Sequence, residues 1–292
     1  MTATLLFCSD PLNPRRVDDH FAVQAEAVRS AGGTVALLDH EALSGGDAAA
    51  AVRRVPRGGG AMWYRGWMMS VERYRALAQA LSERECALVV SPECYAKAHE
   101  LPGWYESFAE LTPRSRWVAT RSGEVPGEAA LAGMAGELGA GPGIVKDYVK
   151  SRKHEWDTAC YVPELRDVAG LRRVVERFVE LQDEYLAGGV VLREFEDFTE
   201  VGGGRAAEAR VWWVDGEPVL VGPHPDEPAV WPEPELSAVA EAVAALGCRF
   251  VTTDVARRAD GEWRVIEVGD GQVSDLPSGV DVMAVIGPLM GR

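Results

Sequence analysis

Phe250-Val-Thr-Thr-Asp254-Val and Trp263-Arg-Val-Ile-Glu267-Val are two apolar stretches near the end of the chain, and a carboxylate interrupts each of them. Their composition predicts two strands, and Ala259-Asp-Gly261 between them is typical of a hairpin turn. A carboxylate inside an apolar strand is costly to bury without a partner. Neighbouring strands can bring Asp254 and Glu267 together, where Mg²⁺ shared with a nucleotide phosphate would neutralise both.

A third carboxylate, Asp270, lies three residues beyond Glu267 in a Gly-rich segment and can complete a set of oxygen ligands. The alternative to a metal site is an ion pair on the face of a strand, in which Arg210 or Arg193 is the partner. The sequence leaves both interpretations open.

The residues upstream of this hairpin alternate between strand and helix patterns. A long amphipathic helix is predicted over 168–186, and 190–197 reads as a strand that ends in charged residues. Residues 208–221 form a second predicted hairpin around Asp215-Gly216, and 234–246 are predicted to be helical.

Four cations stand close together at 146–153 in a chain that is otherwise acidic. The chain has 45 Asp and Glu against 30 Lys and Arg, a formal net charge of -15. Lys146 falls in a predicted strand over 144–149, and Lys150, Arg152 and Lys153 follow in a basic loop. A strand lysine can neutralise a phosphate and the loop can close over it, so we expect an anion site here, although a solvated turn is the alternative. His154 in this loop is the histidine for which we expect a functional role.

The first 115 residues predict an α/β domain. Four short apolar runs read as buried strands, and amphipathic helices are expected at 18–31 and 71–82, an alternation that favours a parallel sheet. Trp63-Tyr-Arg-Gly-Trp67 places Arg65 at the end of a strand, where a guanidinium can grip a carboxylate. An internal salt bridge within the core is the alternative. Residues 91–114 contain repeated Pro and Gly and are expected to be an irregular crossover between domains.

Length and composition bound the class of protein. The 292 residues allow about two domains of roughly 100 to 200 residues each, and 47% hydrophobic with 26% charged residues is typical of a globular protein. The acidic balance disfavours nucleic acid as a partner, and no apolar run approaches the roughly 18 residues of a membrane helix. The N-terminus lacks a signal-peptide pattern, and five scattered cysteines predict no disulfide framework, so we expect a cytoplasmic protein.

The order of these motifs resembles the ATP-grasp superfamily. A lysine in a strand (Lys146) is followed by a basic loop, a strand ending in an acidic hinge (193–195), a Glu-x-Arg strand (Glu208 and Arg210), and finally Asp254 and Glu267. Tyr-Arg-Gly-Trp, Ser-Pro-Glu-Cys-Tyr and Thr-Pro-Arg-Ser in the first half further resemble a clade of small bacterial ATP-grasp proteins. The resemblance spans nearly the whole chain.

The resemblance implies an α/β and α+β architecture. Residues 1–115 would form a Rossmann-like pre-ATP-grasp domain and 116–292 a two-subdomain ATP-grasp fold, in which 116–190 carry the lid and 191–292 the metal site. The residues that it implies bind ATP are Lys146, Lys150, Lys153, Arg193, Glu194, Phe195, Glu196 and Arg210. The residues that it implies hold Mg²⁺ are Asp254, Glu267 and Asp270.

The implied activity is that of an ATP-dependent ligase. A carboxylate of a small acid, such as an amino acid or peptide, would attack ATP to give an acyl phosphate, which an amine or thiol captures, with ADP and phosphate released. Lys146, Arg210 and Arg65 are the expected catalytic residues, Arg65 as the holder of the carboxylate substrate, and a homodimer is the expected assembly. A nucleotide-binding protein without turnover and a phosphotransferase are the alternatives.

Two departures from the family pattern motivate those alternatives. An Asp-Lys pair ahead of the first subdomain is missing, and Arg114, Arg121 or Lys97 are the candidates to replace its lysine. The usual Glu-x-Asn metal motif reads Glu267-Val-Gly269, so that Asp270 or water would supply the third ligand.

Overall fold

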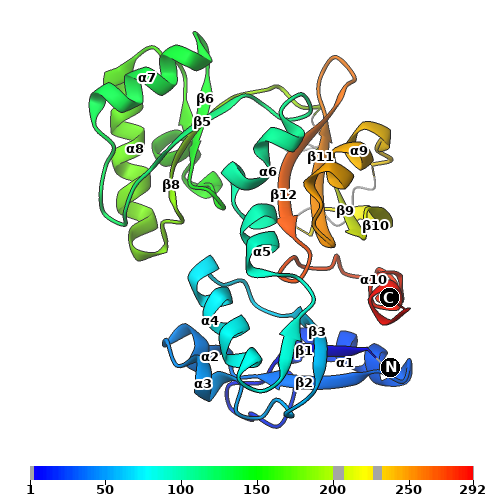
Figure 1. Cartoon of the computed structure of the whole chain (residues 1–292). Coiled ribbons are helices and arrows are strands. Elements are labelled where there is room, and N and C mark those ends of the chain that lie inside the picture. Colours follow the sequence, from blue (N-terminus) through cyan, green and yellow to red (C-terminus); the bar gives the residue numbers. More distant parts are fainter. Residues whose placement is uncertain (1–2, 200–206, 226–231, 292) are drawn as a thin grey trace. The chain divides into compact units, whose positions relative to one another are not determined.

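The computed structural model describes residues 3–199, 207–225 and 232–291 (Figure 1). The chain divides into two compact units. Unit 1 comprises Met1–Ala98, Ala207–Val255 and Glu267–Arg292, and unit 2 comprises His99–Ala206 and Ala256–Ile266. The predicted division at residues 115 and 116 stays a prediction.

Unit 1 contains a four-stranded parallel sheet of order β2-β1-β3-β4. Its strands are β1 (Thr4–Cys8), β2 (Thr34–Leu38), β3 (Gly60–Arg65) and β4 (Cys86–Leu88). The helical segments along this part of the chain are η1 (Asp19–Phe21), α1 (Ala22–Ser30), α2 (His40–Ser44), α3 (Ala48–Ala51), α4 (Val71–Ser82) and α5 (Pro92–His99). The expected parallel α/β arrangement is therefore confirmed.

Helix α4 shows how the sequence sets these elements. Ser70 is the N-cap, and its side chain accepts a hydrogen bond from the backbone N–H of Arg73. Val71, Tyr74 and Leu77 recur at three-residue spacing and are all buried, so one face of the helix packs into the core of the parallel sheet. That core also includes Phe7 of β1.

A second sheet, of order β10-β9-β11-β12, is formed by β9 (Glu208–Val214), β10 (Glu217–Pro223), β11 (Phe250–Arg257) and β12 (Trp263–Asp270). Strands β9 and β10 pair antiparallel, with Val214 opposite Glu217. Asp215 and Gly216 between them both have positive φ, at 51° and 84°, as a tight hairpin turn requires. The adjacency of β11 and β12 confirms the second predicted hairpin. Helices α9 (Ser237–Leu246) and α10 (Met283–Gly291) complete the unit.

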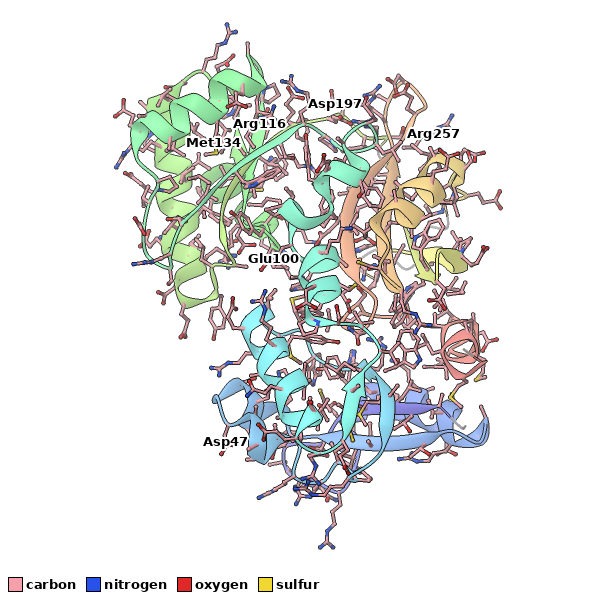
Figure 2. The ribbon with its side chains drawn as sticks, in the orientation of Figure 1. Asp47, Glu100, Arg116, Met134, Asp197 and Arg257 are labelled. Carbon is pink, nitrogen blue, oxygen red and sulfur yellow. The ribbon has the colours of Figure 1, made fainter. Side chains whose placement is uncertain are left out.

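Unit 2 is built on an antiparallel sheet of order β5-β8-β6-β7. Its strands are β5 (Ser115–Ala119), β6 (Gly143–Lys146), β7 (Tyr161–Val162) and β8 (Gly189–Glu194), and its helical segments are α6 (Leu101–Phe108), α7 (Glu128–Leu138), η2 (Lys153–Glu155), η3 (Trp156–Cys160), α8 (Val168–Gln182) and η4 (Asp183–Tyr185). Helices α7 and α8 pack on the sheet through a common core that includes Leu131, Phe178 and Leu192 (Figure 1). Arg116 of β5 donates to Glu137 of α7 at 2.5 Å, near the labelled Met134 in Figure 2.

Two sequence expectations are corrected by this fold. Residues 91–114 are not an irregular crossover, because α5 and α6 occupy most of that stretch. Pro92 and Pro102 stand in the first turns of these helices, where proline is tolerated because the first N–H groups have no partner inside the helix. The strand expected over 144–149 ends at Lys146, where a turn centred on Asp147 begins. No helix within the described ranges is long and apolar enough to cross a membrane.

Replacing Phe178 by alanine should lower the free energy of unfolding of unit 2 by about 3–5 kcal/mol, because the phenyl ring is fully buried between α8 and the sheet. The measurement is urea unfolding followed by circular dichroism. Tyr185→Ala is the control, since Tyr185 is 80% exposed and should change stability by less than about 0.5 kcal/mol. Equal effects of the two substitutions would contradict this assignment of the core.

Candidate functional site

Four polar residues gather on the second sheet of unit 1, and we call them the Arg210 group: Glu208, Arg210, His224 and Asp254. Arg210 donates from Nε to Asp254 Oδ1 and from Nη2 to Asp254 Oδ2, both at 2.7 Å. Its Nη2 also lies 2.9 Å from His224 Nε2. One potential ligand atom from each of Glu208, His224 and Asp254 lies within 4.8 Å of the others.

This group is largely buried, with 14% of the side chain exposed for Arg210 and His224 and 7% for Asp254. Burial by itself raises the pKa of the Asp254 carboxyl, but the charge and hydrogen bonds of Arg210 outweigh burial and hold that pKa well below its usual range. Burial likewise lowers the pKa of Arg210, while Asp254 more than offsets it, so that both groups are charged. The ion pair expected as the alternative to a metal site is thus present.

The hairpin register brings these residues together. Glu208 and Arg210 are two residues apart on β9 and share one face of the strand. Gly222 pairs with Arg210 across the hairpin, and the backbone N–H of His224 donates to the carbonyl of Glu208 at 3.0 Å. Asp254 comes from β11, the neighbour of β9 on its other side.

The other two proposed metal ligands differ from each other. Glu267 on β12 is half-buried, and its charge raises the pKa of Arg210, which places it in the electrostatic range of the Arg210 group. Asp270 is fully buried, and its Oδ1 accepts from the backbone N–H and the side-chain amide of Gln272, both at 2.9 Å. Burial raises the pKa of Asp270 to about 7. The structure therefore places Asp270 in a buried network, and its role as a metal ligand stays a prediction.

The donor atoms at the Arg210 group fit a hard divalent cation. Glu208, Asp254 and Glu267 offer carboxylate oxygens, which Mg²⁺ prefers, and the carboxylate of Asp254 has lone pairs beyond those that Arg210 occupies. His224 adds a nitrogen, which suits a transition metal better than Mg²⁺.

In unit 2, Lys146 lies at the end of β6 with 4% of its surface exposed, and its Nζ is 3.5 Å from the carbonyl of Val149. The adjacent Asp147 fixes this strand end. Its Oδ1 accepts from the N–H groups of Val149 and Lys150, and its Oδ2 accepts from the side chain of Gln182. The buried carboxylate thereby holds the turn that follows Lys146.

An aromatic cluster adjoins the hinge that follows β8. The Phe195 ring meets the rings of Trp156 and Tyr161 edge-on at 5.9 and 5.5 Å, and these two rings stack on each other at 5.2 Å. Trp156 is 38% exposed. A partly open aromatic surface of this kind suits a flat ring such as a nucleobase.

The charged residues around this hinge are engaged within unit 2. Arg193 is buried and donates to the carbonyls of Ile266 and Val265 and to the hydroxyl of Thr112. Glu194 accepts from Arg114 at 2.9 Å, and Glu196 accepts from two nitrogens of Arg264. These contacts stabilise the hinge, and nucleotide contacts by these residues stay predictions.

The basic stretch after β6 is more ordered than the expected open loop. Lys153 and His154 lie in η2 and are exposed, as is Lys150, while Arg152 pairs with Glu155 at 3.0 Å. Of the candidates for the missing lysine, Lys97 donates to the carbonyl of Leu246 at 2.6 Å and Arg114 is bound to the hinge, whereas Arg121 is exposed.

Arg65 is fully buried at the end of β3. Its Nε donates to Gln24 at 2.7 Å and its Nη1 to the carbonyl of Gln272 at 2.9 Å, and its guanidinium lies over the rings of Phe21 and Trp212. Burial lowers the pKa of Arg65 to about 10. Its Nη2 has no partner among the described residues. Binding of a substrate carboxylate by Arg65 stays a prediction, and Nη2 is the atom available for it.

Sequence reasoning missed His224, Trp156 and Tyr161. Counting the hairpin register outward from Asp215-Gly216 would have placed His224 opposite Glu208. No sequence pattern joins Trp156 and Tyr161 to Phe195, because β7, η3 and the end of β8 meet only in the folded unit.

Asp270 should make the protein less stable as the pH rises. Its carboxyl keeps its proton to about pH 7 in the folded state, but loses it near the ordinary value of 3.8 when unfolded, so the unfolded state binds fewer protons in that window. The free energy of unfolding should therefore fall with pH between about 4 and 7, by up to about 1.4 kcal/mol per unit. Urea unfolding of the parent and of Asp270→Asn across this range measures the difference, which should become constant below about pH 4. Asp157→Asn, an exposed carboxylate, is the control and should follow the parent. A pH-independent difference between Asp270→Asn and the parent over the whole range would refute the shift.

Comparison with known proteins identifies the family. A family model described as an ATP-grasp domain, the third family of its clade, matches residues 137–289, more than half of the chain. No curated protein matches the chain.

Solved structures share the fold across the whole chain. The RimK domain protein ATP-grasp from Sphaerobacter thermophilus is 16% identical, with a TM-score of 0.62 and coverage of 99% of this chain and 100% of that one. D-cycloserine synthetase DcsG is 18% identical, with a TM-score of 0.62 and coverage of 99% of both chains. The ATP-grasp ligase PsnB, complexed with minimal precursor, Mg and ADP, is 17% identical, with a TM-score of 0.56 and coverage of 99% of this chain and 96% of that one. The fold class and the resemblance inferred from the sequence are confirmed, and the chain belongs to this family of ATP-grasp domain proteins.

Proposed function

We propose that the protein is an ATP-dependent carboxylate–amine ligase that works through an acyl phosphate. The observation that carries this proposal is the Arg210 group, in which a buried arginine is surrounded by the carboxylates of Glu208, Asp254 and Glu267. Such an arrangement suits phosphate oxygens and a divalent cation together, because it offers a fixed positive charge and hard oxygen ligands.

The proposed reaction needs charge stabilisation more than a protein nucleophile. The carboxylate of a small acid, such as an amino acid or peptide, attacks the γ-phosphorus of ATP and ADP leaves, which gives an acyl phosphate. An amine nitrogen then attacks the acyl carbon and phosphate leaves. Both steps build negative charge on oxygens, which Arg210 and Lys146 would stabilise and orient. Mg²⁺, held by Asp254 and Glu267 with Glu208, would neutralise phosphate charge when bound.

The proteins of similar fold support this reaction class. PsnB is described as an ATP-grasp ligase and its complex contains Mg and ADP, and DcsG is described as a synthetase. In the present chain, the aromatic surface of Trp156, Tyr161 and Phe195 would receive the adenine, and Lys146 would contact phosphate.

Two other functions use the same residues. A nucleotide-binding protein without turnover is favoured by the missing Asp-Lys pair and by Gly269 in place of the Asn of the Glu-x-Asn motif. A phosphotransferase would differ only in its product, and a thiol in place of the amine would give a thioester.

Mg²⁺-ATP should raise the melting temperature of the protein, because a ligand that binds only the folded state stabilises it by about 2.7 kcal/mol at a hundredfold excess over Kd. The shift should be lost in Glu267→Gln, which removes one charged oxygen ligand. Glu262→Gln on the exposed turn before β12 is the matched control and should keep the shift. Differential scanning fluorimetry with ATP alone, with Mg²⁺ alone and with both separates the contributions. Absence of any shift at saturating nucleotide would refute the proposed function.

Turnover should require both an acid and an amine. Screening of amino acids and peptides for ADP release, with mass analysis of the product, should show condensation with loss of water. Lys146→Met should lower kcat on the order of 10²-fold or more, because a charge that stabilises the transition state is removed. A stable phosphorylated product would instead establish the phosphotransferase, and binding without ADP release the non-catalytic protein.

A further inference from the structure

A second polar cluster lies beside the Arg210 group within unit 1, and we call it the Trp67 patch: Asp18, His20, Trp67 and Asp275. Nε2 of His20 donates to Asp275 Oδ1 at 2.8 Å, and the indole Nε1 of Trp67 donates to Asp18 Oδ2 at 3.0 Å. The backbone carbonyl of Asp275 lies 3.5 Å from Arg210 Nη1. The patch therefore adjoins the residues to which the proposed function assigns the phosphate.

The patch is open to solvent yet held in place. Exposed fractions are 40% for the His20 side chain, 53% for the Asp275 side chain and 37% for Trp67. The Trp67 ring is nevertheless fixed on three sides, by the hydrogen bond to Asp18, by His20 at 4.7 Å and by the edge-on ring of Phe21 at 5.2 Å. An exposed indole costs hydrophobic free energy, so its fixed exposure points to a binding role.

The chemistry of the patch favours a small cation. Asp275 accepts one hydrogen bond, at Oδ1, and its Oδ2 has no hydrogen-bond partner among the described residues. A carboxylate oxygen beside an indole ring is a common setting for an ammonium group, which combines an ion pair with a cation–π contact. The nearest arginines do not oppose this, because Arg210 is neutralised by Asp254, and Arg65 is buried against Phe21.

Arg65 gives an independent reason to assign a fixed charge here. Its Nη2 is buried without a partner among the described residues, and Asp275 is the carboxylate that most favours its charge. The buried guanidinium thus attracts the carboxylate of Asp275, while His20 fixes the orientation of that carboxylate. Arg65 and His20 act here as positioning residues for Asp275.

We propose that the Trp67 patch binds the ammonium group of a primary amine, with Asp275 as its ion-pair partner and the Trp67 ring as its apolar wall. The identification of this amine as the acceptor of the acyl group rests on the proposed ligase function. The binding itself does not, because all residues of the patch belong to unit 1 and none of them is assigned to ATP.

Binding of butylammonium to the full-length protein, measured by saturation-transfer NMR and calorimetry without nucleotide, tests the proposal. Butyrate, of the same size and opposite charge, is the matched ligand control. Asp275→Asn should weaken butylammonium binding at least tenfold, and Trp67→Leu should also weaken it. Glu72→Gln, an exposed carboxylate on α4 of the same unit, should bind as the parent does.

The variants at His20 separate positioning from general damage. His20→Gln keeps a side-chain N–H for Asp275 and should retain most of the affinity, whereas His20→Ala should lose it, at unchanged melting temperatures. Equal binding of butyrate, or unchanged affinity in Asp275→Asn, would overturn the proposal. If amines bind but Mg²⁺-ATP gives no thermal shift, the ligase function fails and the amine site stands; the reverse result removes only the amine site.

Discussion

The bidentate ion pair between Arg210 and Asp254 is the interaction on which the candidate site depends. Both charges are largely buried, so removal of either would leave the other without compensation in a medium where that is costly. The pair links β9 to β11, and through Arg210 it reaches His224 and the backbone of Asp275. Because it fixes the guanidinium in one orientation, the charge is preorganised, and the solvent need not reorganise around it when phosphate charge develops.

Asp147 has a comparable part in unit 2, although it is not itself a candidate for catalysis. It is fully buried and its two oxygens accept from backbone and side-chain donors on three segments. Its turn ends β6 directly after Lys146, so the lysine is presented by a rigid strand end. In each unit, a buried carboxylate therefore fixes a cation that the proposed reaction uses.

Similarity of fold at 16–18% identity fits this economy of polar groups. The cores of both units are apolar, and apolar residues of similar volume replace one another with little loss of stability. The groups that bear charge are few, and they stand at strand ends and hairpins, whose positions the hydrogen-bonded registers determine. A chain can thus diverge widely in its core while its charged groups keep their places, and substrate selection is left to surfaces such as the Trp67 patch.

The sequence by itself determined the alternation of strands and helices, the two hairpins and the strand positions of Lys146, Arg210, Asp254 and Glu267, because periodicity and turn residues are local properties. It left open whether Asp254 meets a metal or an arginine, and only the adjacency of β9 and β11 decided that Arg210 is its partner. It also grouped Asp270 with Glu267, although the buried contacts of Asp270 with Gln272 separate the surroundings of the two. The contact of His20 with Asp275, 255 positions along the chain, has no local pattern at all. Such contacts arise from the packing of distant segments, and the free energy that selects them is a property of the whole unit and not of any short stretch.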